Sequence, residues 1–196
     1  GTLAPDGAII KVSAATAELT EHTGRAVVFS DYDEMRTRLD DPGLEVDADS
    51  VIVVRGVGPA GVPGMPEWGM APIPQRLAEA GVRDMVRISD GRMSGTSFGT
   101  VVLHVAPEAA VGGPLALVED GDEIALSVEN RTLDLRLTES ELADRRARLT
   151  APRSAHTRGW PLLYQRHVLQ APRGCDLDFL VHSGDAGLIE PIVGRS

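Results

Sequence analysis

Short apolar runs, separated by glycine, proline and charged residues, recur along the chain and predict many short strands around few helices. The run 50–55, Ser-Val-Ile-Val-Val-Arg, is rich in β-branched residues and is the clearest strand. In the run 132–137, leucines alternate with Asp134 and Arg136, so one face should lie in water. The remaining strands are expected at 8–12, 25–29, 84–88, 101–105, 115–118 and 123–128. This pattern predicts a mainly β fold with peripheral helices, either barrel-like or a sandwich.

Capping signals mark the expected helices. Ser30 or Asp31 can begin a helix that runs to about residue 40, and Thr138 with Glu141 forms a capping box that opens a helix to about residue 149. Other helical segments, each with an early proline, are expected at 74–80, 107–114 and 159–170.

The chain changes character after Pro152. We therefore expect a domain at 1–150 that carries the functional loops, and a C-terminal helix and tail at 151–196 that pack on it or on another domain. The chain also begins without a leader or an obvious first helix, as expected for a domain taken from a longer polypeptide.

Composition and charge exclude several classes of function. The net charge of −10 argues against nucleic acid or an anionic membrane as the main partner. No apolar run approaches the roughly 20 residues that a membrane span needs, and no signal peptide is evident. The single cysteine, Cys175, excludes an internal disulfide and an all-cysteine metal site within the chain. We expect Cys175 to be structural and the protein to be cytoplasmic.

The segment 56–69 contains a literal G-x-G-x-x-G pattern directly after a strand. Three prolines (Pro59, Pro63 and Pro66) forbid the regular helix whose N-terminus would hold a pyrophosphate, so the dinucleotide-binding interpretation is rejected. A stiff loop that presents Glu67 remains. From its residue type alone, Glu67 is more often a solvated carboxylate than a ligand.

The segment 88–100 reads Ile-Ser-Asp-Gly-Arg-Met-Ser-Gly-Thr-Ser-Phe-Gly-Thr and joins two expected strands in a glycine-built hairpin. Glycines let the backbone approach a ligand, and clustered N–H groups can hold an anion, although a flexible connector has the same composition. Nearby, His104 is expected to be a hydrogen-bonded core histidine rather than a ligand. Glu108 is expected at a helix start, where a carboxylate is favoured.

Three motifs occur together in one order: Gly-Pro-Ala-Gly-Val-Pro-Gly-Met-Pro-Glu at 58–67, Ser-Asp-Gly-Arg-Met-Ser-Gly-Thr at 89–96, and His-Val-Ala-Pro-Glu-Ala-Ala-Val-Gly-Gly-Pro at 104–114. With them, the chain from residue 1 to about 180 resembles the C-terminal domain of the dihydroxy-acid and phosphogluconate dehydratase family. The sequences of segments 66–69, 92–96 and 174–180 are more similar to the sugar-acid (aldonate) dehydratases than to the amino-acid biosynthetic branch.

The resemblance implies a swivelling β-barrel (β/β/α) domain like the mobile domain of aconitase-type enzymes. It implies dehydration of a 2,3-dihydroxy sugar acid to a 2-keto-3-deoxy acid by a homo-oligomer, a dimer or tetramer. It also implies an iron–sulfur cluster and a Mg²⁺ ion in the full-length enzyme, held mostly by an N-terminal domain of the same protein. This chain alone is then expected to be inactive and to bind at most Mg²⁺, weakly.

The resemblance also implies roles for individual residues. Ser94 matches the general base, which acts as an alkoxide, and Glu67 matches a magnesium ligand. Thr96 and Ser89 match hydroxyl groups that hold the substrate. Three further side chains are implied to order the loops without touching the substrate: Asp90, Arg92 and His104.

Two other functions remain open at this stage. One is the dihydroxy-acid dehydratase of branched-chain amino-acid biosynthesis, and the other is a stand-alone, non-catalytic binding module. Intact Ser94, Thr96 and Glu67 favour a catalytic half-site over the binding module.

Overall fold

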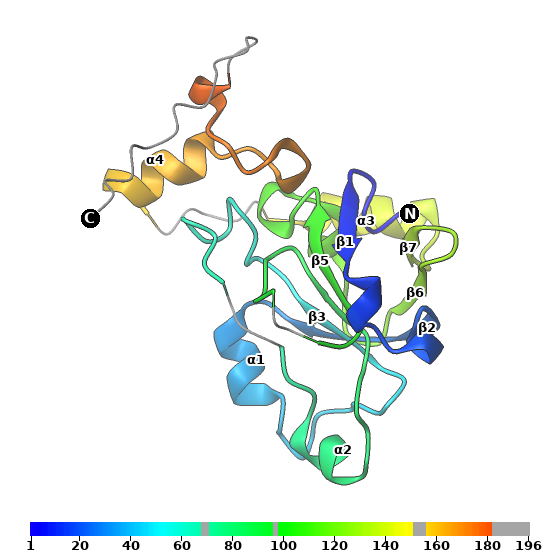
Figure 1. The fold of residues 1–196 in the computed structure, drawn as a ribbon. Coiled ribbons are helices and arrows are strands. Elements are labelled where there is room, and N and C mark those ends of the chain that lie inside the picture. The colour runs from blue at the N-terminus through cyan, green and yellow to red at the C-terminus, as the bar shows by residue number, and fades with distance from the viewer. Residues whose placement is uncertain (68–70, 96–97, 151–155, 182–196) are drawn as a thin grey trace, which may run out of the picture.

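The computed structural model describes residues 1–67, 71–95, 98–150 and 156–181 (Figure 1). Within them the chain forms one seven-stranded mixed sheet in the order β1-β5-β4-β3-β2-β6-β7. The strands are β1 Gly7–Ile10, β2 Glu21–Phe29, β3 Val51–Val54, β4 Arg87–Ser89, β5 Val101–Ala106, β6 Glu123–Ser127 and β7 Thr132–Leu135. The α-helices are α1 Tyr32–Arg38, α2 Gln75–Glu79, α3 Glu139–Arg148 and α4 Gly159–His167. Short 3₁₀ helices are η1 Val12–Ala14, η2 Ala17–Leu19, η3 Ala109–Val111, η4 Pro114–Leu117, η5 Ala171–Arg173 and η6 Asp178–Leu180.

The middle of the sheet is parallel and its two ends are antiparallel. The four central strands β2, β3, β4 and β5 run parallel to one another. At one end β1 pairs antiparallel with β5, and at the other end β6 pairs antiparallel with both β2 and β7. Parallel strands end at the same edge of a sheet. The segments that follow β3, β4 and β5 therefore leave from one edge, and all three expected motifs lie there.

The parallel strands are buried on both faces, which explains the continuous apolar run at β3. Val51 and Val53 face one core together with apolar residues of β4, β5, β6 and β7. Ile52 and Val54 face a second core, which Met35 of α1 completes. Asp31 begins α1 by accepting a hydrogen bond from the backbone N–H of Glu34, as the sequence predicts.

The sheet curls into a half-barrel, and its two ends are joined through the first residues of the chain (Figure 1). The backbone N–H of Leu3, just before β1, donates to Leu133 of β7 over 3.0 Å. The Thr2 hydroxyl accepts from the N–H of Leu135 at 3.0 Å. The prediction of a mainly β fold with peripheral helices is confirmed. Its kinship to aconitase-type swivelling domains stays a prediction.

The strand expected at 115–118 is wrong, because this segment is the 3₁₀ helix η4. Pro114 occupies its first turn. The Arg55 guanidinium takes the carbonyl groups of this segment, donating to Ala116 at 2.9 Å and to Val118 at 2.7 Å. Those carbonyls are therefore unavailable to a sheet ladder.

The hairpin expected at 88–100 is also wrong. β4 and β5 are parallel, with Arg87 opposite Val101 and Ile88 opposite Val102, so the intervening segment is a crossover. β4 begins at Arg87 rather than at residue 84, because its pairing with β3 and β5 starts there. The capping box of Thr138 and Glu141 that opens α3 is confirmed.

After the undescribed residues 151–155, α4, η5 and η6 form an arm at the opposite end of the molecule from α2 (Figure 1). We call residues 159–181 the C-terminal arm. The boundary expected at 150/151 falls beside the undescribed residues, so the two-part division stays a prediction. In the part of the chain that the structure describes, no helix has the length and apolarity needed to cross a membrane.

Candidate active site at the carboxyl edge of the sheet

Two loops that leave neighbouring strands lie side by side at this edge. The loop after β3 runs to Glu67, and the crossover after β4 passes through Arg92. A parallel β-bridge pairs Glu67 with Arg92. Both side chains are exposed. Since Ser94 follows Arg92 by two residues, the bridge brings the expected magnesium ligand and the expected base into one region.

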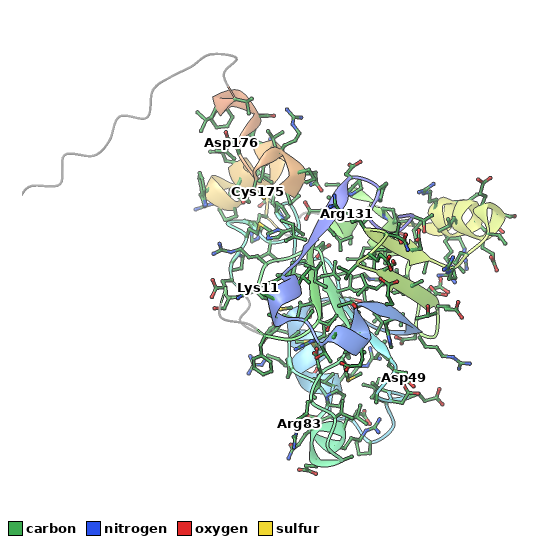
Figure 2. The ribbon with its side chains drawn as sticks, turned by 45° about the vertical axis from the view of Figure 1, so that its right-hand side comes forward. Lys11, Asp49, Arg83, Arg131, Cys175 and Asp176 are labelled. Carbon is green, nitrogen blue, oxygen red and sulfur yellow. The ribbon has the colours of Figure 1, made fainter. Side chains whose placement is uncertain are left out.

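Ser94 is half-buried, and a lysine reaches the crossover beside it. The Lys11 ammonium donates to the carbonyl oxygen of Gly95 over 3.1 Å. Lys11 lies just after β1, at the surface of the half-barrel (Figure 2). A positive charge close to a serine favours the ionised form of its hydroxyl. Sequence reasoning missed Lys11, although it is the only lysine of the chain.

Asp90 fastens the start of the crossover to both neighbouring loops. Its fully buried carboxylate accepts from the backbone N–H groups of Gly56 and Val57 at 3.0 Å and of Ala109 at 2.9 Å. Burial raises the pKa of Asp90 to about 6, and the charge of Glu108 adds to this, against the three N–H donors that favour the carboxylate. Asp90 therefore orders loop backbone, and its part in an active site stays a prediction.

Glu108 is a second buried carboxylate that sequence reasoning placed only at a helix start. It does precede η3, but its side chain makes no cap and is 1% exposed. It accepts from the N–H of Ala60 at 2.9 Å and of Gly61 at 3.0 Å. The loop lies so close that a Cβ on Gly58 would stand 2.5 Å from a Glu108 oxygen. Glu108 thus fixes the middle of the Glu67 loop.

A buried ion pair lies on the first stem of the crossover, and its carboxylate also binds the second stem through Thr100. Arg87 and Asp84 side chains are 3% and 6% exposed and lie 2.6 Å apart. Asp84 also accepts from the N–H and the hydroxyl of Thr100 and from the Thr16 hydroxyl. Although burial opposes it, these hydrogen bonds and the charge of Arg87 hold the pKa of Asp84 below its ordinary value.

His104 differs from the hydrogen-bonded core histidine expected from the sequence. Its backbone adopts φ 55°, which is uncommon outside glycine, while its N–H donates to Gly91 at 3.2 Å. Its Nδ1 is buried and has no hydrogen-bond partner within the described residues. Burial and the charge of Arg92 lower the pKa of His104, which favours the neutral form of its ring.

The remaining expected site residues lie on the same crossover. Ser89 is 2% exposed, and its hydroxyl accepts from the N–H of Gly91 at 3.0 Å. It supports the turn, and its contact with substrate stays a prediction. Thr96 lies outside the described residues.

The described residues offer little to a metal centre on their own. Nowhere among them do three His, Cys, Asp or Glu side chains gather closely enough to hold a metal ion. Glu67 is an exposed oxygen ligand of the kind Mg²⁺ prefers, so the chain can supply one ligand to such an ion. The described residues do not fit an iron–sulfur cluster. Cys175, the only cysteine, is half-buried on the C-terminal arm against Met65, and clusters need several thiolates.

Comparison with known families identifies the family of the chain. Residues 1–175 match the family model described as dihydroxy-acid/6-phosphogluconate dehydratase, C-terminal. The chain belongs to this family. The match covers β1 to β7, both site loops and most of the C-terminal arm, so the family resemblance seen in the motifs is confirmed.

Individual relatives of this dehydratase C-terminal domain include sugar-acid enzymes. It is similar to a 6-deoxy-6-sulfo-D-gluconate dehydratase of Pseudomonas putida, at 56% identity over 98% of this chain and 33% of the relative. It is 54% identical to an L-arabonate dehydratase of Azospirillum brasilense, over 92% of this chain and 32% of the relative. A dihydroxy-acid dehydratase of Chromohalobacter salexigens is 44% identical over 91% of this chain and 30% of the relative. The chain thus spans about a third of the length of these relatives.

Proposed function

We propose that this domain is the C-terminal part of a sugar-acid dehydratase, which converts a 2,3-dihydroxy sugar acid to a 2-keto-3-deoxy acid. The observation that supports it most directly is the Glu67–Arg92 bridge, which gathers the family motifs at one edge of the sheet. The higher identity to the sulfogluconate and arabonate dehydratases than to the dihydroxy-acid dehydratase favours a sugar acid as substrate.

In the proposed reaction, the Ser94 alkoxide takes the proton from carbon 2 of the substrate. The electron pair of that C–H bond forms the carbon 2–carbon 3 double bond, and hydroxide leaves carbon 3 with the C–O bonding pair. The resulting enol takes a proton at carbon 3 and releases the proton of its carbon 2 hydroxyl, which gives the 2-keto acid, and the proton held by Ser94 combines with the departed hydroxide to form water. The net change is the loss of one water, with no oxidation or reduction.

A serine hydroxyl is too weak an acid to ionise unaided near pH 7. Lys11 and Arg92 supply positive charge on either side of Ser94 along the crossover, and the backbone around Gly95 adds oriented dipoles. A magnesium ion, when bound, would polarise the substrate carboxylate and stabilise the enolate-like charge. On this chain, Glu67 would hold it.

The remaining parts of the proposal concern the whole enzyme. We propose that an N-terminal domain of the same protein contributes the iron–sulfur cluster and the other magnesium ligands, because this chain has one cysteine and its described residues offer one suitably placed carboxylate. We further propose a cytoplasmic homo-oligomer, a dimer or tetramer. Exposed apolar side chains on the C-terminal arm, such as Trp160 at 58% and Phe179 at 51%, are consistent with burial in a larger assembly.

A chimaeric enzyme tests the proposed function. This chain replaces the matching third of the Azospirillum brasilense L-arabonate dehydratase, and the chimaera is assayed for 2-keto acid with L-arabonate, other aldonates and 2,3-dihydroxyisovalerate. We expect turnover of at least one aldonate and its loss in Ser94→Ala. Turnover of 2,3-dihydroxyisovalerate alone would contradict the substrate class. A folded, cofactor-loaded chimaera without any product would contradict the catalytic role and favour the binding module.

A further inference from the structure

The C-terminal arm touches the Glu67 loop at several points. Gln165 donates to the carbonyl oxygen of Ala60 over 3.0 Å. The Cys175 Sγ lies 3.5 Å from the Met65 Sδ, and Met65 is only two residues before Glu67. Figure 2 shows Cys175 where the arm meets the body of the molecule. A segment more than a hundred residues away in sequence is thus in contact with the loop that presents Glu67.

A reciprocal pair connects the arm to the loop through Glu108. The Gln170 carboxamide donates to Glu108 Oε1 over 2.6 Å and accepts from the Glu108 backbone N–H over 2.9 Å. The Gln170 carboxamide can do both because it carries an N–H donor and a carbonyl acceptor, which a carboxylate or an ammonium group does not. On its other side, the same carboxylate accepts from the N–H groups of Ala60 and Gly61. Gln170 therefore completes the set of donors around a buried charge.

The arm is also attached through η5, which contacts β5. None of the residues of α4 is buried, and Trp160 and Leu163 are 58% and 42% exposed. With little apolar surface buried under α4, these polar contacts and the Cys175–Met65 contact carry much of the docking. The loop in turn packs directly against Glu108, since a Cβ added at Gly58 would stand 2.5 Å from an oxygen of that carboxylate.

We propose that the C-terminal arm is a brace that sets the position of Glu67, with Gln170 and Glu108 as its positioning residues. Docking of the arm orients the Glu108 carboxylate, which holds the N–H groups of Ala60 and Gly61, and these fix the loop that ends at Glu67. The benefit to a bound magnesium ion rests on the proposed function. The mechanical link between arm and loop does not.

Cys175 provides a reporter for the link, because it is the only thiol of the chain and is half-buried against the loop. The 196-residue chain is reacted with a thiol reagent, and amide hydrogen exchange of 57–66 is followed in parallel. Gln170→Ala leaves Glu108 short of a donor, so we expect at least about tenfold faster thiol modification and faster exchange at Ala60 and Gly61. Leu163→Ala, on the exposed face of α4, is the matched control and should change neither.

The grafted dehydratase supplies the second readout. Gln170→Ala should raise the Mg²⁺ concentration for half-maximal activity by about tenfold, a range known for residues that orient metal ligands, with kcat at saturating Mg²⁺ largely kept. A merely structural role would lower the amount of active enzyme without moving the Mg²⁺ dependence. If Gln170→Ala does not fold, Gln170→Asn, which keeps the carboxamide on a shorter chain, takes its place.

Unchanged thiol reactivity and exchange in the variant that folds would overturn the brace. Altered reactivity with unaltered Mg²⁺ dependence would overturn the link to Glu67. An inactive graft would count against the proposed function alone, because the thiol and exchange measurements need no activity.

Discussion

Glu67 and Arg92 form a parallel β-bridge between two loops that leave adjacent strands. This relationship places the expected metal ligand and, two residues past Arg92, the expected base Ser94 on neighbouring backbone. A small sugar acid and its ion could contact both. Had the loops left opposite edges of the sheet, the proposed chemistry would have had no common site.

Replacement of Glu67 by glutamine should abolish most of the activity of the grafted dehydratase. The amide keeps the shape of the side chain but loses the charge that a hard cation prefers. We expect kcat/KM to fall by at least about 100-fold at low Mg²⁺, because metal stabilisation of the transition state is worth several kcal/mol. Glu79→Gln, on the exposed surface of α2 far from the site, is the matched control. Equal activity of Glu67→Gln and the control across a Mg²⁺ titration would contradict the assignment.

Gly58→Ala should destabilise the protein, because the new Cβ would lie 2.5 Å from Glu108 Oε2 and 3.0 Å from the Asp90 carbonyl oxygen. Overpacking of this kind costs about 1–3 kcal/mol. Urea unfolding measures the loss. Gly95→Ala is the comparison, since a Cβ added at Gly95 would meet nothing within 4 Å. Similar unfolding free energies for the two variants would show that the loop yields easily at Gly58.

Breaking the Asp84–Arg87 pair should cost far more than breaking a surface pair. Arg87→Met leaves Asp84 as a buried charge without its cation, for an expected loss of about 3–5 kcal/mol. Arg38 is paired with Glu34 on α1 with both side chains about a third exposed, and Arg38→Met should cost no more than about 1 kcal/mol. Thermal and urea unfolding test both. A loss for Arg87→Met no larger than that for Arg38→Met would mean that the crossover stems do not depend on this pair.

Asp90 and Asp84 should make opposite contributions to the pH dependence of stability. The folded-state pKa of Asp90, about 6, lies above its ordinary value of 3.8, so folded protein binds the proton more tightly between those values. The contribution of Asp90 to the free energy of unfolding therefore falls as pH rises from about 4 to 6, by up to about 3 kcal/mol. Asp84 has a lowered pKa, so its contribution is present above its ordinary value of 3.8 and is lost as pH falls through the folded-state pKa.

Urea unfolding across about pH 3.5–8 measures both effects. The difference in unfolding free energy between the wild type and Asp90→Asn should decrease from about pH 4 to 6 and then level off. The same difference for Asp84→Asn should decrease on acidification below about pH 4. A flat Asp90 difference would mean that the three N–H donors cancel the effect of burial on the pKa of Asp90.

Local signals in the sequence were sufficient for most elements and for the family. The Asp31 and Thr138 caps, the β-branched strand β3 and the three motifs are all readable within short windows. Segment 115–118 was not, because Arg55, some sixty residues earlier, takes its carbonyl groups. The sequence did not reveal that β4 and β5 are parallel either, because strand direction depends on pairing across the whole sheet.

The candidate site likewise contains residues that local motifs identify and contacts that only the folded structure reveals. The motifs named Ser94, Glu67 and Asp90, but the partners of Asp90 and the inward turn of Glu108 depend on which loops meet at the edge of the sheet. Gln170 carries no local signal at all, because its meaning comes from Glu108, 62 residues earlier. Lys11 could have been noticed as the sole lysine, but its position beside Gly95 needed the pairing of β1 with β5.

The bonds from Thr2 and Leu3 to β7 have a consequence for solubility. An outer strand with unpaired N–H and carbonyl groups can recruit a strand from another molecule, which is how many sheets begin to aggregate. Here Thr2 and Leu3 occupy the outer edge of β7, so this edge is protected from pairing with a strand of another molecule. Without these bonds, the edge of β7 would be open to pairing with a strand of another molecule.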